Sequence, residues 1–309
     1  MIIVYGESLI DMVAGLNGEF SPMPGGAPYN FARALAMRGL AVGYSNPFSS
    51  DRFGHMLKGT LEASGAVHLG ATSARPTSLA IVFRRPDGQP DYTFYREAVA
   101  DRDHEPGAAA ALTERPAEGF HTGGLALVPP DSARTCDLLR HFGARGVLRT
   151  LDVNMRPIIA RSMGVSDQDY RRAALSAIAL ADIVKVSDED LAHLGLAGDL
   201  VDAAQSLVSR QCRLVVLTLG ERGAWALTAT ERRKQAAIAL RPVDTVGAGD
   251  CFFAGFVAAL LRRRDAIAGD RSPDAGELDE ALQHATACAA FTLARKGCQP
   301  PNLDDIPRP

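Results

Sequence analysis

The 309-residue sequence contains no apolar run near the roughly 20 residues that a membrane-spanning helix needs. It starts with a strand-like MIIVY at 1–5 and no basic leader, so we expect neither a membrane anchor nor a signal peptide. The formal net charge is only −3, which disfavours a broad nucleic-acid surface. We therefore expect a cytoplasmic protein without nucleic-acid or membrane partners.

Cysteine is sparse and irregularly spaced. The five cysteines are Cys136, Cys212, Cys251, Cys288 and Cys298, and none belongs to a CxxC pair. We therefore expect buried reduced thiols, with no disulfide framework and no zinc site. Two nucleotide-binding signatures are missing as well: the sequence has no GxxxxGKS/T loop, and no GxGxxG follows the first strand. These absences argue against a P-loop enzyme and a Rossmann oxidoreductase.

What the sequence does contain is a regular alternation of strand-like and helix-like segments. Short apolar runs predict buried strands, and apolar residues at helical spacing predict helices. We expect the strands at 2–5, 41–45, 146–153, 182–186 and 213–218, and the first helices at 27–38 and 52–63. This order is typical of a doubly wound, mostly parallel α/β sheet, and one domain spanning 1–309 fits the length.

Two segments, at about 12–24 and 77–97, do not fit this alternation. The first contains the turn-like Leu16-Asn17-Gly18, and the second has β-rich runs on either side of Pro86-Asp87-Gly88. Two such ribbons predict a small β lid over the carboxyl edge of the sheet, where α/β proteins bind their ligands.

The strongest chemical signal is Asp244-Thr245-Val246-Gly247-Ala248-Gly249-Asp250, which opens an apolar helical stretch at 251–261. Small residues at a helix start leave backbone N–H groups free to hold an anion. Asp250 lies beside that anion site, and we expect the helix dipole to keep its carboxyl ionised. The simpler alternative is an N-cap carboxylate in a flexible turn.

Three further runs carry polar residues at element ends. Gly25-Gly26 leads into the helix that carries Asn30, and Asp11 ends an apolar strand. A carboxylate in that position suits two neighbouring hydroxyl groups, because both of its oxygens accept hydrogen bonds. Arg156 follows a central strand in DVNMRP at 152–157 and supplies a fixed cation. The simpler alternatives are an ordinary turn and a solvated strand end.

Together these runs resemble the motifs of the ribokinase-like (PfkB) carbohydrate kinase family over nearly the whole chain. The resemblance implies an ATP-dependent sugar kinase with a Rossmann-like three-layer fold. It makes Asp250 the catalytic base and the amides of Gly247, Ala248 and Gly249 the anion hole. It assigns sugar contacts to Asp11, Gly25, Gly26, Asn30, Tyr95, Arg96 and Arg156. It assigns nucleotide contacts to Lys185, Ser187, Thr218, Gly220, Gly223 and Thr286.

The resemblance also implies two cations. Mg²⁺ would be held through water by Asp190, and a monovalent cation, with K⁺ as the candidate, would lie near Asp244 and Val246. Ser187 and Asp190 stand where the family's NxxE motif has Asn and Glu, and Thr286 stands where many relatives carry Asn.

The sugar is expected to be fructose. Leu9 stands where ribokinase has Asn, and YTFYRE at 92–97 followed by Ala100-Asp101 resembles the fructokinase branch. A 2-keto-3-deoxygluconate kinase is an alternative, because Arg96 and Arg156 could hold its carboxylate. Ribokinase and nucleoside-type kinases, the aminoimidazole riboside enzyme included, are others.

A non-catalytic sugar or nucleotide sensor is the alternative from another class, but binding alone does not require the base Asp250. We also expect a homodimer in which the lids pair. The second ribbon carries Ile81, Phe83 and Phe94, and an exposed apolar edge of this kind favours being covered.

Overall fold

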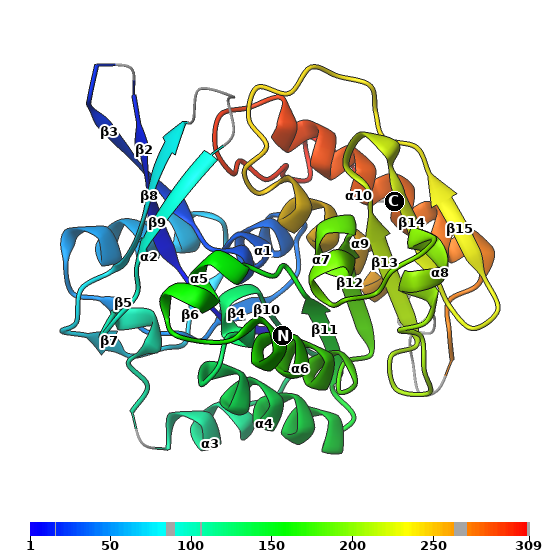
Figure 1. Cartoon of the computed structure of the whole chain (residues 1–309), viewed down its shortest axis with the longest axis horizontal. Helices are drawn as coiled ribbons and strands as arrows, with labels where there is room; N and C mark the ends of the chain where they lie inside the picture. Colours follow the sequence, from blue (N-terminus) through cyan, green and yellow to red (C-terminus); the bar gives the residue numbers. More distant parts are fainter. Residues whose placement is uncertain (16, 85–89, 106, 263–270, 308–309) are drawn as a thin grey trace.

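The computed structural model describes the whole chain except residues 16, 85–89, 106, 263–270 and 308–309 (Figure 1). Within that part the main sheet has nine strands. From one edge to the other they are β15 (Arg232–Gln235), β14 (Ala224–Leu227), β13 (Leu214–Thr218), β12 (Ile183–Ser187), β11 (Leu148–Asp152), β10 (Gly119–Gly123), β1 (Ile2–Val4), β4 (Val42–Tyr44) and β6 (Val67–His68). The pairs from β13 to β6 are parallel, and β14 and β15 are antiparallel additions.

Helices cover both faces of this sheet (Figure 1). One apolar cluster packs one face against α1 (Ala27–Met37), α2 (Arg52–Ala63), α9 (Ala248–Arg262) and α10 (Ala275–Leu293). A second cluster packs the other face against α3 (Ala108–Thr113), α4 (Asp131–Ala144), α5 (Pro157–Ser162), α6 (Asp167–Ile178), α7 (Asp188–His193) and α8 (Leu200–Gln205). The predicted three-layer, mostly parallel α/β fold is confirmed. No helix in the described residues is long and apolar enough to cross a membrane.

The strands that the apolar runs predicted all form, and four other strands of the main sheet were missed, namely β6, β10, β14 and β15. β10 reads GFHTG, which has only one strongly apolar residue, yet it lies between β1 and β11 and is fully buried. His121 stacks on Phe31 at 3.5 Å between ring centroids, and its Nδ1 is 2.9 Å from Thr150 Oγ1. Tertiary contacts rather than local pattern make this strand. β14 and β15 were missed because the alternation of strands and helices stops there.

The two irregular segments form a separate four-stranded sheet. Its order is β3 (Phe20–Gly25), β2 (Leu9–Ala14), β8 (Ser78–Arg84) and β9 (Pro90–Tyr95). β2 pairs antiparallel with β3 and parallel with β8, so the sheet joins both segments. Pro22 and Pro24 suit the edge strand β3, because proline has no N–H for a further ladder. The expected turn at Pro86-Asp87-Gly88 lies outside the described residues, as does Leu16 of the first turn.

Smaller elements complete the chain. A two-stranded ribbon pairs β5 (Phe48–Ser49) with β7 (Thr72–Ser73), and short 3-10 turns span Ala100–Arg102, Gly124–Leu127 and Gly220–Arg222. All five cysteines are free and buried, as expected.

Candidate active site

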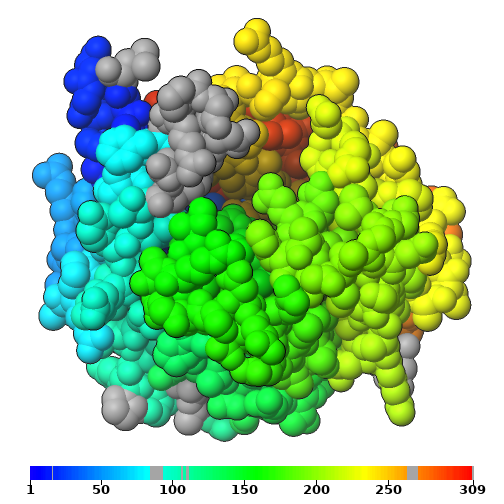
Figure 2. Space-filling model, viewed as in Figure 1, coloured from blue at the N-terminus to red at the C-terminus, as the bar shows by residue number. Residues whose placement is uncertain are grey.

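A cavity of about 340 Å³ lies where the amino-terminal ends of α1 and α9 face the four-stranded sheet. Figure 2 shows the molecule hollowed between that sheet and the yellow-to-red carboxyl-terminal half. Nine residues expected from the sequence line it. They are Asp11, Gly26, Asn30, Arg156, Lys185, Val246, Gly247, Gly249 and Asp250. Motifs more than 200 residues apart therefore meet in one place.

Asp250 lies buried in the first turn of α9 and lines this cavity. Asn30 Nδ2 donates a 2.9 Å hydrogen bond to Asp250 Oδ2. Burial raises the pKa of Asp250 from its ordinary 3.8 to about 7, and the charge of Asp152 adds to the rise, while Asn30 opposes it. The helix dipole was expected to keep this carboxyl ionised, but with a pKa of about 7 it is partly protonated at neutral pH, because burial disfavours the charged form. A pKa near 7 is the one that suits a proton acceptor at neutral pH.

Asn30 has a second polar atom in the same cavity. Its Oδ1 is buried and has no hydrogen-bond partner in the described residues. A buried amide oxygen normally finds a donor, so a ligand hydroxyl is the natural partner here. Gly247 and Gly249, at the start of α9, line the cavity beside Asp250, and their amides have no carbonyl partner in the preceding turn. The amide of Ala248 is different, because it donates to the carbonyl of Thr245 at 3.3 Å. The cavity thus offers both a hydroxyl site and an anion site.

Lys185 lies at the anion end of this cavity. Its Nζ is 2.9 and 3.0 Å from the two oxygens of Asp152, and both side chains are almost fully buried. Burial opposes the charge, but Asp152 and Asp190 outweigh it and raise the pKa of Lys185. A Cβ placed on Gly249 would lie 3.5 Å from Nζ, so this fixed cation sits next to the expected anion hole. Its position suits a phosphate contact rather than one to adenine.

Asp11 also points into the cavity, and two glycines make room for its surroundings. A Cβ on Gly25 would lie 2.3 Å from Asp11 Oδ2. Gly26 has φ +109°, and a Cβ there would lie 2.5 Å from the carbonyl oxygen of Glu7. Burial raises the pKa of Asp11 to about 7, although Arg156 opposes the rise. The Gly-Gly motif is therefore a packing requirement of the site.

Glu7 and Asn154 are two polar residues of the cavity that were not assigned from the sequence. Glu7 is buried, and its carboxylate accepts hydrogen bonds from the amides of Ala27 and Leu125 at 3.2 and 3.1 Å. Asn154 has φ +37°, a left-handed conformation that is uncommon outside glycine and is concentrated at functional sites. Glu7 lies four residues before Asp11, and Asn154 lies in the DVNMRP run at 152–157, so both are close in sequence to residues that were assigned. The sequence alone did not indicate which side chains of these runs face the cavity.

Tyr95 and Arg96 do not line this cavity, which corrects the expectation that they reach the sugar. Arg96 is buried, and its Nη1 donates to Asp101 Oδ2 at 2.8 Å. Tyr95 is 59% exposed, while its neighbour Phe94 faces the cavity. Successive strand residues point to opposite faces, so only one of the two aromatics can face inward.

Apart from Lys185, most residues assigned to the nucleotide lie at the carboxyl ends of β12 and β13, and Thr286 lies in α10. Thr218 ends β13, and Gly220 and Gly223 belong to the 3-10 turn that follows. Ser187 Oγ caps α7 by accepting from the amide of Asp190 at 3.0 Å. Thr286 Oγ1 donates to the carbonyl of Leu282 inside α10. None of these lines the cavity, and their contact with a nucleotide stays a prediction.

Both carboxylate oxygens of Asp190 accept hydrogen bonds from other residues of the chain. Its Oδ1 accepts from Met155 N at 2.7 Å, and its Oδ2 accepts from the amide and hydroxyl of Ser187. This pattern makes Asp190 a bridge between two loops and weakens its assignment to the waters of Mg²⁺. The described residues contain no cluster of three His, Cys, Asp or Glu side chains. They fit Mg²⁺ carried by nucleotide phosphates, its common mode of binding, rather than a protein cage.

Asp244, which was expected to lie near a monovalent cation, joins the loop before α9 to the loop after α10. Its Oδ1 accepts from Val246 N at 3.1 Å, and its Oδ2 accepts from Gly297 N at 2.8 Å. Contact of Asp244 and Val246 with a monovalent cation such as K⁺ stays a prediction.

Comparisons with known proteins agree with this geometry. Residues 1–305 match the model of the pfkB family carbohydrate kinases. "Probable fructokinase-4" of Arabidopsis thaliana is 35% identical over 97% of this chain and 93% of its own length. The crystal structure of fructokinase with bound ATP from Xylella fastidiosa superposes with a TM-score of 0.86 at 26% identity, over 98% of this chain and 96% of that one. Aminoimidazole riboside kinase from Salmonella enterica gives 0.81 at 25% identity, with the same coverage.

The family match spans nearly the whole chain, and the motifs that carry the resemblance lie together in one cavity. The chain belongs to the pfkB family of carbohydrate kinases.

Proposed function

We propose that this protein is an ATP-dependent sugar kinase whose preferred acceptor is fructose. The observation that carries the proposal is the buried Asp250 carboxyl beside Gly247 and Gly249, in the cavity where the buried Asn30 Oδ1 has no hydrogen-bond partner in the described residues. We further propose a cytoplasmic enzyme of one domain over residues 1–309, with the four-stranded sheet as its lid.

In the proposed reaction a sugar hydroxyl attacks the γ-phosphate of ATP. Asp250 accepts the hydroxyl proton as the new O–P bond forms, while the bond from the γ-phosphorus to the bridging oxygen breaks and ADP leaves. The amides of Gly247, Ala248 and Gly249 stabilise negative charge on the transferring group, and Lys185 adds a fixed positive charge beside them. Mg²⁺ bound to the ATP phosphates would neutralise part of their charge. Burial of the site makes each of these electrostatic contacts stronger than it would be in water.

The composition of the cavity favours a neutral polyol. Glu7, Asp11 and Asn30 Oδ1 offer acceptors for hydroxyl groups, and Leu9 and Phe94 offer apolar walls. A 2-keto-3-deoxygluconate kinase needs cations for a carboxylate, but Arg96 is already paired with Asp101. Only Arg156 is left of the two arginines considered for that role. The relatives that are named fructokinases also support fructose as the substrate.

Asp250→Asn tests the base. We expect kcat to fall by roughly 10²–10⁴-fold, the usual scale for general acid–base catalysis, with ATP affinity nearly unchanged. Because the folded-state pKa of about 7 lies above the ordinary 3.8, the parent loses stability relative to the variant as the pH rises from 4 to 7. The melting temperature of the variant should therefore equal or exceed that of the parent at pH 8. Kinetics and thermal melts measure both effects.

Asp202→Asn is the matched control, because Asp202 also lies in the first turn of a helix but is exposed and paired with Arg232. Its turnover should stay near that of the parent. Turnover of Asp250→Asn within a few-fold of the parent would remove Asp250 from the role of base.

A sugar panel tests the substrate. We expect a higher kcat/KM for fructose than for ribose, adenosine, aminoimidazole riboside or 2-keto-3-deoxygluconate. A tenfold preference for the keto acid, about 1.4 kcal/mol in transition-state terms, would reverse the assignment. Absence of turnover with every sugar would instead favour the sensor.

We also propose that the lids pair in a homodimer. Phe20 and Phe83 are 40% and 49% exposed and pack edge-to-face at 5.8 Å on the four-stranded sheet. Exposed apolar side chains grouped in this way commonly mark an interface. Sedimentation should show a dimer for the parent and a shift towards monomer for Phe20→Ser with Phe83→Ser. A parent that sediments as a strict monomer would exclude lid pairing.

A further inference from the structure

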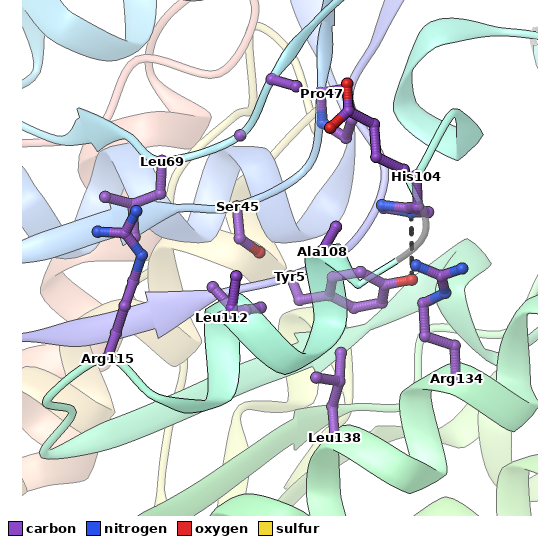
Figure 3. A pocket seen from close by; sticks show the side chains of 14 residues that line it. Tyr5, Ser45, Pro47, Leu69, His104, Ala108, Leu112, Arg115, Arg134 and Leu138 are labelled. Atoms are coloured by element: carbon purple, nitrogen blue, oxygen red, sulfur yellow. Dashed lines mark hydrogen bonds between the residues drawn. The ribbon is translucent and has the colours of Figure 1, made fainter.

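A second cavity, of about 170 Å³, lies at the same carboxyl edge of the main sheet (Figure 3). Tyr5, Ser45 and Leu69 are the residues that directly follow β1, β4 and β6, and all three line it. α3 and α4 close its other side. It shares no lining residue with the catalytic cavity. Ligands of α/β sheets bind beyond the carboxyl ends of strands, and this cavity occupies such a position.

One end of the second cavity is polar and cationic. Arg134 on α4 lies there beside the Tyr5 hydroxyl and the His104 ring, whose Nε2 is 3.3 Å from Tyr5 Oη (Figure 3). Tyr5 is 96% buried, since only 4% of its surface is exposed. His104 is neutral at pH 7, because burial, aided by Arg134, lowers its pKa to about 4. This leaves a hydroxyl and a guanidinium as the strong donors at that end.

The acids nearest to this end do not neutralise Arg134, because each is already paired with another arginine. The pairs are Arg96 with Asp101, Arg75 with Asp103, and Arg102 with Asp131. Within the described residues Arg134 makes no hydrogen bond or ion pair. Arg115 lies at the opposite end of the cavity, and the exposed Glu105 is the one carboxylate that lines it. With His104 neutral, the lining carries a net charge of about +1, so an anion is favoured.

We propose that this cavity binds a small organic anion, a phosphate or carboxylate with a short apolar part, and that this anion regulates the enzyme. The oxyanion pairs with the Arg134 guanidinium, which presents two parallel N–H donors to such groups, and with the Tyr5 hydroxyl. The apolar part lies against Leu69, Leu112 and Leu138, which all line the cavity. In Figure 3 Leu112 and Leu138 are on the side of the Tyr5 ring, and Leu69 is drawn near Arg115.

The second cavity is connected to the catalytic cavity through the backbone, because Tyr5 of the one and Glu7 of the other are two residues apart. Tyr5 precedes Gly6 and Glu7, and Glu7 lines the catalytic cavity. Gly6 is held on both sides: its amide donates to Asn46 Oδ1 at 2.8 Å, and its carbonyl accepts from Tyr44 Oη at 2.6 Å. A ligand that fixes Tyr5 therefore acts on Glu7 through one rigid residue. Because Glu7 faces the proposed sugar site, the expected effect is on the KM for the sugar rather than on kcat.

The test is a calorimetric titration of the parent with inorganic phosphate and, separately, with succinate. Saturating sugar and a non-hydrolysable ATP analogue fill the catalytic cavity. We expect saturable millimolar binding of at least one probe, which also identifies the oxyanion as phosphate or carboxylate. Arg134→Gln should weaken it at least tenfold, about 1.4 kcal/mol, and Tyr5→Phe, which keeps the ring, should weaken it by a smaller factor. The binding readout needs no turnover, so it is separate from the test of the proposed kinase reaction.

Arg140→Gln is the matched control, because Arg140 is an exposed arginine of the same helix α4 that pairs only with Asp137 in the described residues. It should bind the probe as the parent does. The bound probe should change the sugar KM of the parent and leave that of Arg134→Gln unchanged. Absence of saturable binding, or equal binding by Arg134→Gln, would overturn the site, and binding without any change in KM would overturn its regulatory role.

Discussion

The hydrogen bond from Asn30 to Asp250 is the contact on which the site depends. It joins residues 220 positions apart, one in the first turn of α1 and the other in the first turn of α9. The same two helices pack through Phe31 and Phe253, whose rings lie 5.7 Å apart. A buried carboxylate without a donor would be costly, so Asn30 makes the burial of Asp250 tolerable. Burial in turn raises the pKa to about 7, a value that would suit the proposed base.

The loops behind Asp250 are tied together by charged side chains that are themselves buried. Lys185 on β12 pairs with Asp152 at the end of β11, and Asp190 accepts from Met155 in the loop after β11. These contacts fix the carboxyl ends of neighbouring parallel strands relative to one another. Removing one partner of such a pair leaves an uncompensated buried charge and is strongly destabilising. The rigidity of the catalytic floor is therefore electrostatic as well as apolar.

The sequence predicted those parts of the site that rest on backbone geometry. A Gly-Ala-Gly run before an apolar helix requires an anion-binding terminus, and Gly25-Gly26 requires a close approach, here to Asp11 and Glu7. It also predicted that the segments at about 12–24 and 77–97 form β ribbons, because they interrupt the alternation of strands and helices. The side-chain partners were not predictable in the same way.

Arg96 and Asp190 illustrate that limit. Each carries a charge that fits a ligand, and each turns out to be bound by its own chain, Arg96 by Asp101 and Asp190 by Met155 and Ser187. Whether a charged residue serves the ligand or the fold depends on neighbours brought together only by tertiary structure. The same holds for the pKa of Asp250, because its rise comes from burial, which no local motif encodes.

A direct measurement of the Asp250 titration tests the central claim that burial makes this carboxyl a base at neutral pH. Carboxyl ¹³C NMR of the enzyme labelled at aspartate, compared with Asp250→Asn, assigns the resonance, because the half-buried Asp11, whose pKa is also raised, stays in both spectra. The midpoint in the unliganded enzyme should lie near pH 7. A midpoint near the ordinary 3.8 would contradict the claim. Burial would then not have raised the pKa, and the carboxylate would be a weak proton acceptor at neutral pH.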